Sequence, residues 1–195
     1  MAVDPLLGLV SQGPTLPHHH ASQGQGSHFL LDLMKSYGKQ RNLHKAMEIH
    51  SHIILHENMF PKELSISNSL VRMYIQCGAL AEAKEVFDDL ILRNVGSWNA
   101  LIAGYVQKGL HEEAIDCFTN MLKEGISPNV VTFSYILKAC SSLGSLELGI
   151  EIHEEIMERG LLKRNAVLGT SLVDMYAKCN MMENAQEVFE SLPIR

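Results

Sequence analysis

The sequence repeats itself at long intervals, and this self-similarity restricts the chain to folds built from copies of one unit. Residues 69–77 read SLVRMYIQC, and residues 171–179 read SLVDMYAKC, an offset of 102 positions. A second phrase, EIHSHI at residues 48–53, returns as EIHEEI at residues 151–156, an offset of 103 positions. The chain is therefore predicted to be an array of similar supersecondary units.

The clearest copy of the unit occupies residues 95–129 and reads as two short helices joined by a turn. Its first helix has apolar residues at helical spacing and stops before Gly109. The apolar stripe of its second helix consists of Ala114, Cys117, Phe118, Met121 and Leu122. Gly125 and Pro128 then end this helix. Two helices this short cannot bury their apolar faces alone, so the unit needs neighbours.

In-phase copies of this pattern divide the chain into five units of unequal length. We place them at residues 27–63, 64–94, 95–129, 130–165 and 166–195. Their first helices are expected at residues 28–38, 67–77, 97–108, 132–143 and 169–179. The predicted fold class is all-α, an α-solenoid of helix–turn–helix repeats in which first helices line one face and second helices the other.

Residues 1–26 lack a hydrophobic period and are expected to form a disordered leader. The three histidines at residues 18–20 are interpreted as part of this polar tract and not as a metal site. The leader contains Asp4 and no Lys or Arg, so it is a poor match to an organelle transit peptide. No apolar run approaches the roughly 20 residues that span a bilayer, so no membrane partner is expected.

The formal net charge of −6 argues against a general affinity for nucleic acid, but the charges are unevenly distributed. The expected first helices contain Lys35, Arg72, Lys108, Lys138 and Lys178 against Asp32 and Asp174. Most acidic residues fall in the second helices. This distribution predicts a mildly positive groove with modest, salt-sensitive phosphate contacts. The alternative, an ordinary solvated face with scattered lysines, stays open.

Motifs for catalysis or metal binding do not occur in a suitable context. The four cysteines are widely spaced with no CxxC pair, which favours small core thiols over disulfides or a zinc site. His52 and His56 have a chelating i, i+4 spacing but no HExxH motif, so an exposed helix face is favoured. We therefore expect a non-catalytic recognition module, not an enzyme, without a cofactor or a metal.

The repeated phrases resemble the pentatricopeptide repeat family, in particular its plant-type tract of standard, long and short motifs. Residues 95–129 are similar to the standard motif, and residues 130–165, with LKACSSLGSLELGIEIHEEI, to the long motif. Residues 64–94 and 166–195 resemble short motifs, and residues 27–63 a degenerate long one. A tetratricopeptide array, the competing family, should hold a period of about 34 residues. The unit lengths of 31, 35 and 36 residues found here argue against it.

In that family each unit reads about one base of single-stranded RNA, mainly through its fifth and its last residue. The corresponding residues here are Asn68 with Asn94, Asn99 with Asn129, Ser134 with Asn165, and Thr170. Leu31 has no hydrogen-bonding group, so the first unit is not expected to read a base. The resemblance implies the footprint 5′-pyrimidine, pyrimidine, purine, purine-3′. From the residues alone, a helix N-cap is the favoured interpretation of Asn68, Ser134 and Thr170.

The second residue of each unit packs against bases in this family. Here the residues are Ser65, Gly96, Val131 and Val167. Since Ser65 and Gly96 offer little surface, the upstream half should grip RNA weakly.

The resemblance implies sequence-selective RNA binding in organellar RNA editing or transcript processing, in a mitochondrion or chloroplast. The implied partners are single-stranded RNA and, in trans, an editing deaminase or another protein of the family. The alternative is a protein-interaction scaffold, or a fragment of a longer protein that docks another chain. Self-association is a further possibility through Ala185, Val188, Phe189 and Leu192, which lack a following repeat.

Overall fold

The structure is a computed structural model that describes residues 23–55 and 64–192. These residues form helices and turns, with no strand among them. The helices are α2 (Gln23–Lys39), α3 (Leu43–Leu55), α4 (Leu64–Cys77), α5 (Leu80–Asp88), α6 (Val95–Lys108), α7 (His111–Lys123), α8 (Val130–Leu143), α9 (Leu146–Glu158), the short 3-10 helix η1 (Leu162–Arg164), α10 (Ala166–Lys178) and α11 (Met182–Ser191). The predicted all-α solenoid is confirmed.

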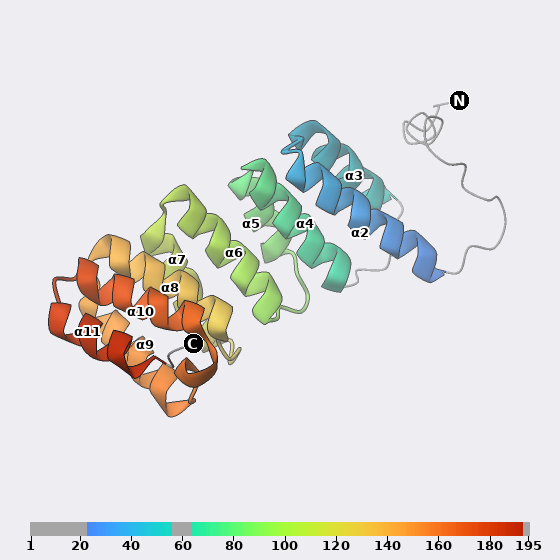
Figure 1. The fold of residues 1–195 in the computed structure, drawn as a ribbon. Helices are drawn as coiled ribbons and strands as arrows, with labels where there is room; N and C mark the ends of the chain where they lie inside the picture. Colours follow the sequence, from blue (N-terminus) through green and yellow to red (C-terminus); the bar gives the residue numbers. More distant parts are fainter. Residues whose placement is uncertain (1–22, 56–63, 193–195) are drawn as a thin grey trace, which may run out of the picture.

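Successive helices pair into hairpins that stack along one direction (Figure 1). The first helices α2, α4, α6, α8 and α10 each pack against the next one, forming a continuous layer that we name the first-helix face. Each of α3, α5, α7 and α9 contacts its own first helix and also the first helix that follows. This bridging buries apolar side chains from three helices at every junction, which a single hairpin could not do.

The tight turns of four of the five described hairpins contain residues that tolerate a left-handed backbone, whereas the turn between α2 and α3 has Arg41 at φ 52°. Gly78, Gly109 and Gly144 end α4, α6 and α8 with φ of 81°, 76° and 70°. A side chain with a Cβ is strained at such φ values, and Asn is the residue that tolerates them best after Gly. Asn180 takes this role after α10, at φ 60°. Gly or Asn at these positions therefore predicts a turn directly, because these residues accept a positive φ.

The helices begin earlier than the hydrophobic pattern predicted. α6 begins at Val95 and α8 at Val130, whereas residues 97 and 132 were expected. The cause is capping: Asn94 and Asn129 are the N-caps, and their side chains accept hydrogen bonds from first-turn backbone N–H groups, so each helix starts directly after its cap.

The interpretation of Asn68, Ser134 and Thr170 as N-caps is wrong. Each lies in the second turn of its helix, because the helix has already begun four residues earlier.

Two expectations about the ends of the chain need correction. The leader was expected to reach residue 26, but α2 already begins at Gln23, since a packed helix extends by one backbone hydrogen bond per added residue. Residues 1–22, with the histidine run, lie outside the described residues, as does His56.

Ala185 and Val188, expected on an uncovered surface, are buried between α10 and α11, whereas Phe189 is 67 % exposed. Self-association through this end stays a prediction, as does the division of the chain into five unequal units.

The described residues carry no group of three or more acidic, His or Cys side chains placed to hold a metal ion. Cys77, Cys117, Cys140 and Cys179 are free thiols, and burial raises the pKa of Cys117 and of Cys140 to about 12. Cys117 and Cys140 are therefore protonated packing groups. Within the same part of the chain, no helix combines the length and apolar character that crossing a membrane requires.

Candidate nucleic-acid interface

Three side chains at the junction of α6 and α8 form a hydrogen-bonded group, which we name the Asn99 cluster: Asn99, Asn129 and Thr132. The Asn99 Nδ2 donates to Asn129 Oδ1 over 3.1 Å. The Thr132 hydroxyl donates to Asn99 Oδ1 over 2.6 Å. The structure thus brings together the two asparagines that the family resemblance paired across 30 positions of sequence.

The start of α8 fixes the orientation of Asn129. Its Oδ1 accepts from the backbone N–H groups of Val131 and Thr132, at 3.0 and 3.1 Å. Its own backbone N–H donates to the Thr132 hydroxyl over 3.1 Å, which completes a capping box. A cap of this kind stabilises a helix by about 1 kcal/mol, so the amide is held by the fold in the absence of any ligand.

The hydrogen-bonding capacity that remains in the cluster is mostly donor. Asn129 Oδ1 already accepts from three N–H groups and lies 3.2 Å from the Thr132 hydroxyl, whereas no described residue accepts from its Nδ2. On Asn99, one N–H hydrogen and one oxygen lone pair are left over. Asn129 is exposed and Asn99 is 8 % exposed, so Asn129 presents its two free N–H hydrogens to solvent at the first-helix face.

The equivalent residues one unit upstream, Asn68 and Asn94, are not joined by a hydrogen bond. Asn94 caps α6 by accepting from the Ser97 backbone N–H over 3.0 Å. The Ser97 hydroxyl donates to the Asn94 backbone carbonyl over 2.8 Å and not to Asn68. Asn68 Oδ1 is buried without a hydrogen-bond partner among the described residues. The upstream pair is therefore close to the same helix start but lacks the linked geometry of the Asn99 cluster.

The downstream candidates make local bonds only. The Ser134 hydroxyl donates to the Val130 carbonyl over 2.9 Å, and the exposed Thr170 donates to the Ala166 carbonyl over 3.0 Å. Asn165 Nδ2 donates to the Leu161 carbonyl over 2.8 Å, and its side chain does not cap α10. Ser134 and Asn165 are thus not joined to each other, and their part in base reading stays a prediction.

The residues expected to lie against base faces differ in the surface they offer. Val131 is 48 % exposed and Val167 is 70 % exposed. Ser65 and Gly96 lie at the equivalent positions of α4 and α6, with no aliphatic surface comparable to a valine. The apolar surface for stacking therefore lies on α8 and α10.

Electrostatically, the centre of the first-helix face differs from its downstream end. The sequences of α4, α6 and α8 contain no Asp or Glu but do contain Arg72, Lys108 and Lys138. On α10, Asp174 pairs with Lys178 at 2.9 Å and accepts from the Ser141 hydroxyl at 2.9 Å. The hydrogen bond from Lys178 lowers the pKa of Asp174. Partial burial acts in the opposite direction, and the hydrogen bond from Ser141 lowers the pKa further. The free positive charge is therefore concentrated over the middle helices, where a polyanion would be attracted.

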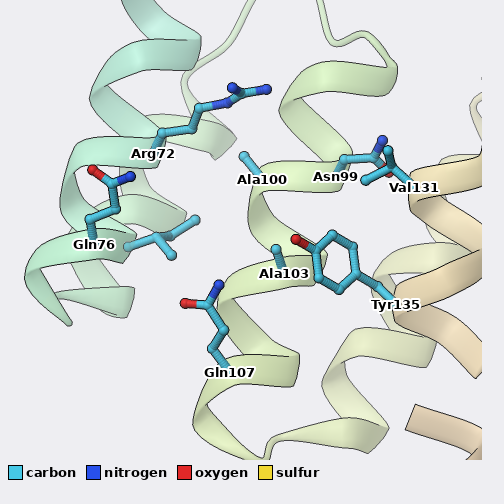
Figure 2. A pocket seen from close by; sticks show the side chains of 9 residues that line it. Arg72, Gln76, Asn99, Ala100, Ala103, Gln107, Val131 and Tyr135 are labelled. Atoms are coloured by element: carbon cyan, nitrogen blue, oxygen red, sulfur yellow. The ribbon is translucent and has the colours of Figure 1, made fainter. Parts of the chain in front are cut away.

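A cavity of about 310 Å³ opens on the first-helix face between α4, α6 and α8 (Figure 2). Ala100 and Ala103 of α6 lie at its centre, and their small side chains leave the space empty. Arg72 and Gln76 border it on the α4 side, Val131 and Tyr135 on the α8 side, and Asn99 and Gln107 on α6. The Asn99 cluster therefore stands at the edge of a hollow large enough to admit part of a nucleotide.

Sequence reasoning missed Thr132 and the residues of this cavity. The signal for Thr132 was present, because a hydroxyl residue three positions after an N-cap Asn is the pattern of a capping box. The cavity had no comparable signal, because it arises from two alanines that meet longer side chains of two other helices only after stacking.

Profiles of known families match most of the repeated region. The PPR repeat family profile matches residues 93–142, and the PPR repeat profile matches residues 65–95, 131–161 and 170–193.

Curated relatives from Arabidopsis thaliana have the same family name. One pentatricopeptide repeat-containing protein is 36 % identical over 154 residues, which are 79 % of this chain and 22 % of the relative. A second, named mitochondrial, is 44 % identical over 126 residues, which are 65 % of this chain and 14 % of the relative. A third, named chloroplastic, is 42 % identical over 142 residues, covering 72 % of this chain and 19 % of the relative. The chain thus spans about a fifth of the length of these relatives.

Solved structures agree at the level of the fold. The crystal structure of the pentatricopeptide repeat protein PPR10 from maize superposes with a TM-score of 0.64 at 25 % identity, covering 83 % of this chain and 23 % of PPR10. PPR10 in complex with an 18-nt psaJ RNA element superposes with a TM-score of 0.68 at 15 % identity, covering 95 % of this chain and 26 % of PPR10. Together, the profile matches, the Arabidopsis relatives and the stacked hairpins show that this chain belongs to the pentatricopeptide repeat family.

Proposed function

We propose that this chain binds single-stranded RNA along the first-helix face and reads one base with the Asn99 cluster. The observation that carries the proposal is the 3.1 Å hydrogen bond between Asn99 and Asn129, which joins a largely buried amide of α6 to an exposed amide at the start of α8. Single-stranded RNA exposes the Watson–Crick edges of its bases, and short polar side chains suit their readout. The solved RNA complex of PPR10 shares this fold and supports the choice of ligand.

The donor character of the cluster fits a pyrimidine, the base class that the family resemblance implies for this pair. Asn129 offers two N–H hydrogens and no free oxygen lone pair, so it seeks an acceptor on the base. Cytosine and uracil both have the O2 carbonyl at the Watson–Crick edge, next to ring atom N3. Asn99, with one donor and one acceptor left, can bond N3 of cytosine as a donor or N3–H of uracil as an acceptor. One rigid site therefore accepts both pyrimidines.

The remaining units extend the footprint with less definition. Asn68 with Asn94 is assigned a second pyrimidine, and Ser134 with Asn165, followed by Thr170, two purines. The resulting footprint is 5′-pyrimidine, pyrimidine, purine, purine-3′, with the strongest selection at the second position. Base contact against the exposed Val131 and Val167 supports a firmer grip at the downstream half.

We assign the whole protein a role in organellar RNA editing or transcript processing, with the described repeats as a recognition module that is not itself catalytic. Relatives named mitochondrial and chloroplastic support an organellar location, in a mitochondrion or a chloroplast. A module of this kind needs a catalytic partner in trans or on the same chain, such as an editing deaminase or another protein of the family. The plant-type alternation of standard, long and short motifs is part of the same proposal.

Fluorescence anisotropy with short labelled RNAs tests RNA binding directly. An RNA with the proposed footprint should bind more tightly than one with the purines first, by about tenfold, which corresponds to about 1.4 kcal/mol. The variant Asn99→Ala should lose this preference. The matched control is Asn120→Ala, which removes an exposed amide from α7, away from the first-helix face. Equal binding of both RNAs by the unaltered chain, or no saturable binding, would contradict the proposal.

A further inference from the structure

The cavity between α4, α6 and α8 has a chemical character of its own, distinct from that of the Asn99 cluster at its edge. Besides Asn99, its lining includes one cation, Arg72, and two further primary amides, Gln76 and Gln107, and it includes no carboxylate. The three helices that form it contain no Asp or Glu at all. Its polar groups are therefore predominantly hydrogen-bond donors beside a full positive charge, a composition that suits an anion.

Arg72 reaches from α4 across the cavity toward α6 (Figure 2). Its guanidinium forms no ion pair or hydrogen bond with any described residue, although it is exposed. An Arg presents five N–H donors in a planar fork, which matches the oxygen geometry of a phosphate group. A guanidinium without a protein acceptor at the rim of a cavity is positioned to bind an external one.

The amides beside Arg72 are oriented to help it. Gln76 Oε1 lies against Gly38 of α2, so close that a Cβ at Gly38 would be 2.1 Å from it. This contact leaves the Gln76 amide nitrogen directed toward α6 and the cavity (Figure 2). Gln107 also points its amide nitrogen toward the cavity from the C-terminal half of α6 (Figure 2). The absence of a Cβ at Gly38 thus leaves room for the Gln76 amide at the rim of the cavity.

The repeat-equivalent position in the last hairpin shows that Arg72 is a particular feature of this site. Arg72 and Gln76 correspond to Asp174 and Lys178, at the offset of 102 positions. There the carboxylate neutralises the cation through a 2.9 Å ion pair. In α4 the exchange of Asp for Arg and of Lys for Gln removes the pair and leaves one uncompensated charge. The two helices therefore differ in the charge that this pair of positions leaves uncompensated.

We propose that Arg72, with Gln76 and Gln107, binds one phosphate group of the RNA backbone next to the nucleotide read by the Asn99 cluster. This inference rests on the proposed function, because the anion is a phosphodiester of the bound strand. Arg72 then fixes the register of the strand, and Asn99 and Asn129 select the base. A phosphate contact of this kind contributes affinity for every sequence and selects none.

The test is a salt titration of RNA binding, between about 50 and 200 mM salt, for the unaltered chain and three variants. Arg72→Gln should bind all RNAs about three- to tenfold more weakly, with a slope of log affinity against log salt that is smaller by about 0.7. Arg72→Lys should retain most of the affinity, because Lys also binds phosphate as a point charge. Lys123→Gln is the matched control, since it removes one exposed positive charge from the end of α7.

A methylphosphonate scan locates the contact. One linkage of the RNA at a time is replaced by a neutral methylphosphonate. At one linkage, the loss of charge should weaken RNA binding by the unaltered chain but not by Arg72→Gln. Equal affinity and salt slope for Arg72→Gln and Lys123→Gln would overturn the inference while leaving the proposed function intact. A change of base preference in Arg72→Gln at unchanged salt slope would overturn it as well. If the unaltered chain binds no RNA, the proposed function and this inference fail together.

Discussion

The two asparagine pairs of the first-helix face have the same residue types at equivalent positions, but their hydrogen bonds differ. Asn99 is bonded to both Asn129 and Thr132. Asn68 is bonded to neither Asn94 nor Ser97, and its Oδ1 is buried without a partner among the described residues. A pair of reading residues identified from sequence can therefore be rigid in one unit and unlinked in the next.

The third residue of each helix explains the difference. Thr132 and Ser97 both accept from the backbone N–H of the preceding cap, at 3.1 and 2.9 Å. Each hydroxyl has one hydrogen to donate. Thr132 donates it to Asn99, whereas Ser97 donates it to the Asn94 carbonyl. The comparison teaches that the orientation of the reading amide depends on three residues, of which the family pattern names two.

Removing the hydroxyl group of the third helix residue should have the largest effect on the free energy of unfolding. Thr132→Val should lower the free energy of unfolding by about 2–3 kcal/mol, because it leaves Asn99 Oδ1 and the Asn129 N–H without their partner at a fully buried position. Ser97→Ala should cost about 1–2 kcal/mol, because the N–H and the carbonyl that lose their partner both belong to Asn94 and Asn68 is unaffected. Urea unfolding followed by circular dichroism measures both, and a larger loss for Ser97→Ala would contradict this explanation.

Truncating the reading asparagines should lower the free energy of unfolding by less. Asn99→Ala should lower the free energy of unfolding by about 1–2 kcal/mol, since the Thr132 hydroxyl and Asn129 Oδ1 each lose a bond. Asn68→Ala should be close to neutral, because it removes a buried oxygen that already lacks a partner. Thermal unfolding of the two variants side by side decides the matter, and equal losses would show that Asn68 is as firmly bonded as Asn99.

A second comparison shows that the core keeps the symmetry that the first-helix face has lost. His50 lies 2.9 Å from the Tyr74 hydroxyl, and His153 lies 2.9 Å from the Tyr176 hydroxyl. The ring pairs are edge-on in both cases, with centroids 5.5 and 5.6 Å apart. Burial lowers the pKa of both histidines below 6.5, opposed in part by Asp89 and Glu154 respectively. These twin contacts join the second helix of one hairpin to the first helix of the next.

The smallest expected effect is the change that these two histidines make in how stability depends on pH. Because their pKa is lower in the folded than in the unfolded chain, the unfolded chain binds more protons below about pH 6.5, and stability falls as the pH drops through this range. His50→Gln and His153→Gln should each make this loss shallower, and by the same amount. Urea midpoints measured between about pH 7 and pH 5 check the prediction. Unequal effects, or greater stability in acid, would contradict it.

The fold was largely predictable from the sequence because its determinants are local. The apolar spacing of the helices and the glycines at Gly78, Gly109 and Gly144 report directly on stereochemistry. The helix starts were placed too late because caps lie outside the apolar period. The approach of Asn99 to Asn129 was expected through family resemblance alone, since no local pattern joins residues in different hairpins. The bond from Thr132 and the cavity over Ala100 and Ala103 depend on the packing of three helices, which neither periodicity nor motif spacing encodes.

The central claim is that the linked pair Asn99–Asn129 reads a base and the unlinked pair Asn68–Asn94 reads one less well. Its most direct test is selection of bound RNAs from a random pool by the unaltered chain, by Asn99→Thr and by Asn68→Thr. We predict a pyrimidine at the position assigned to Asn99, replaced by a purine in Asn99→Thr, and a much weaker change in Asn68→Thr. An unchanged base preference in Asn99→Thr, or an equal response of both variants, would contradict the account.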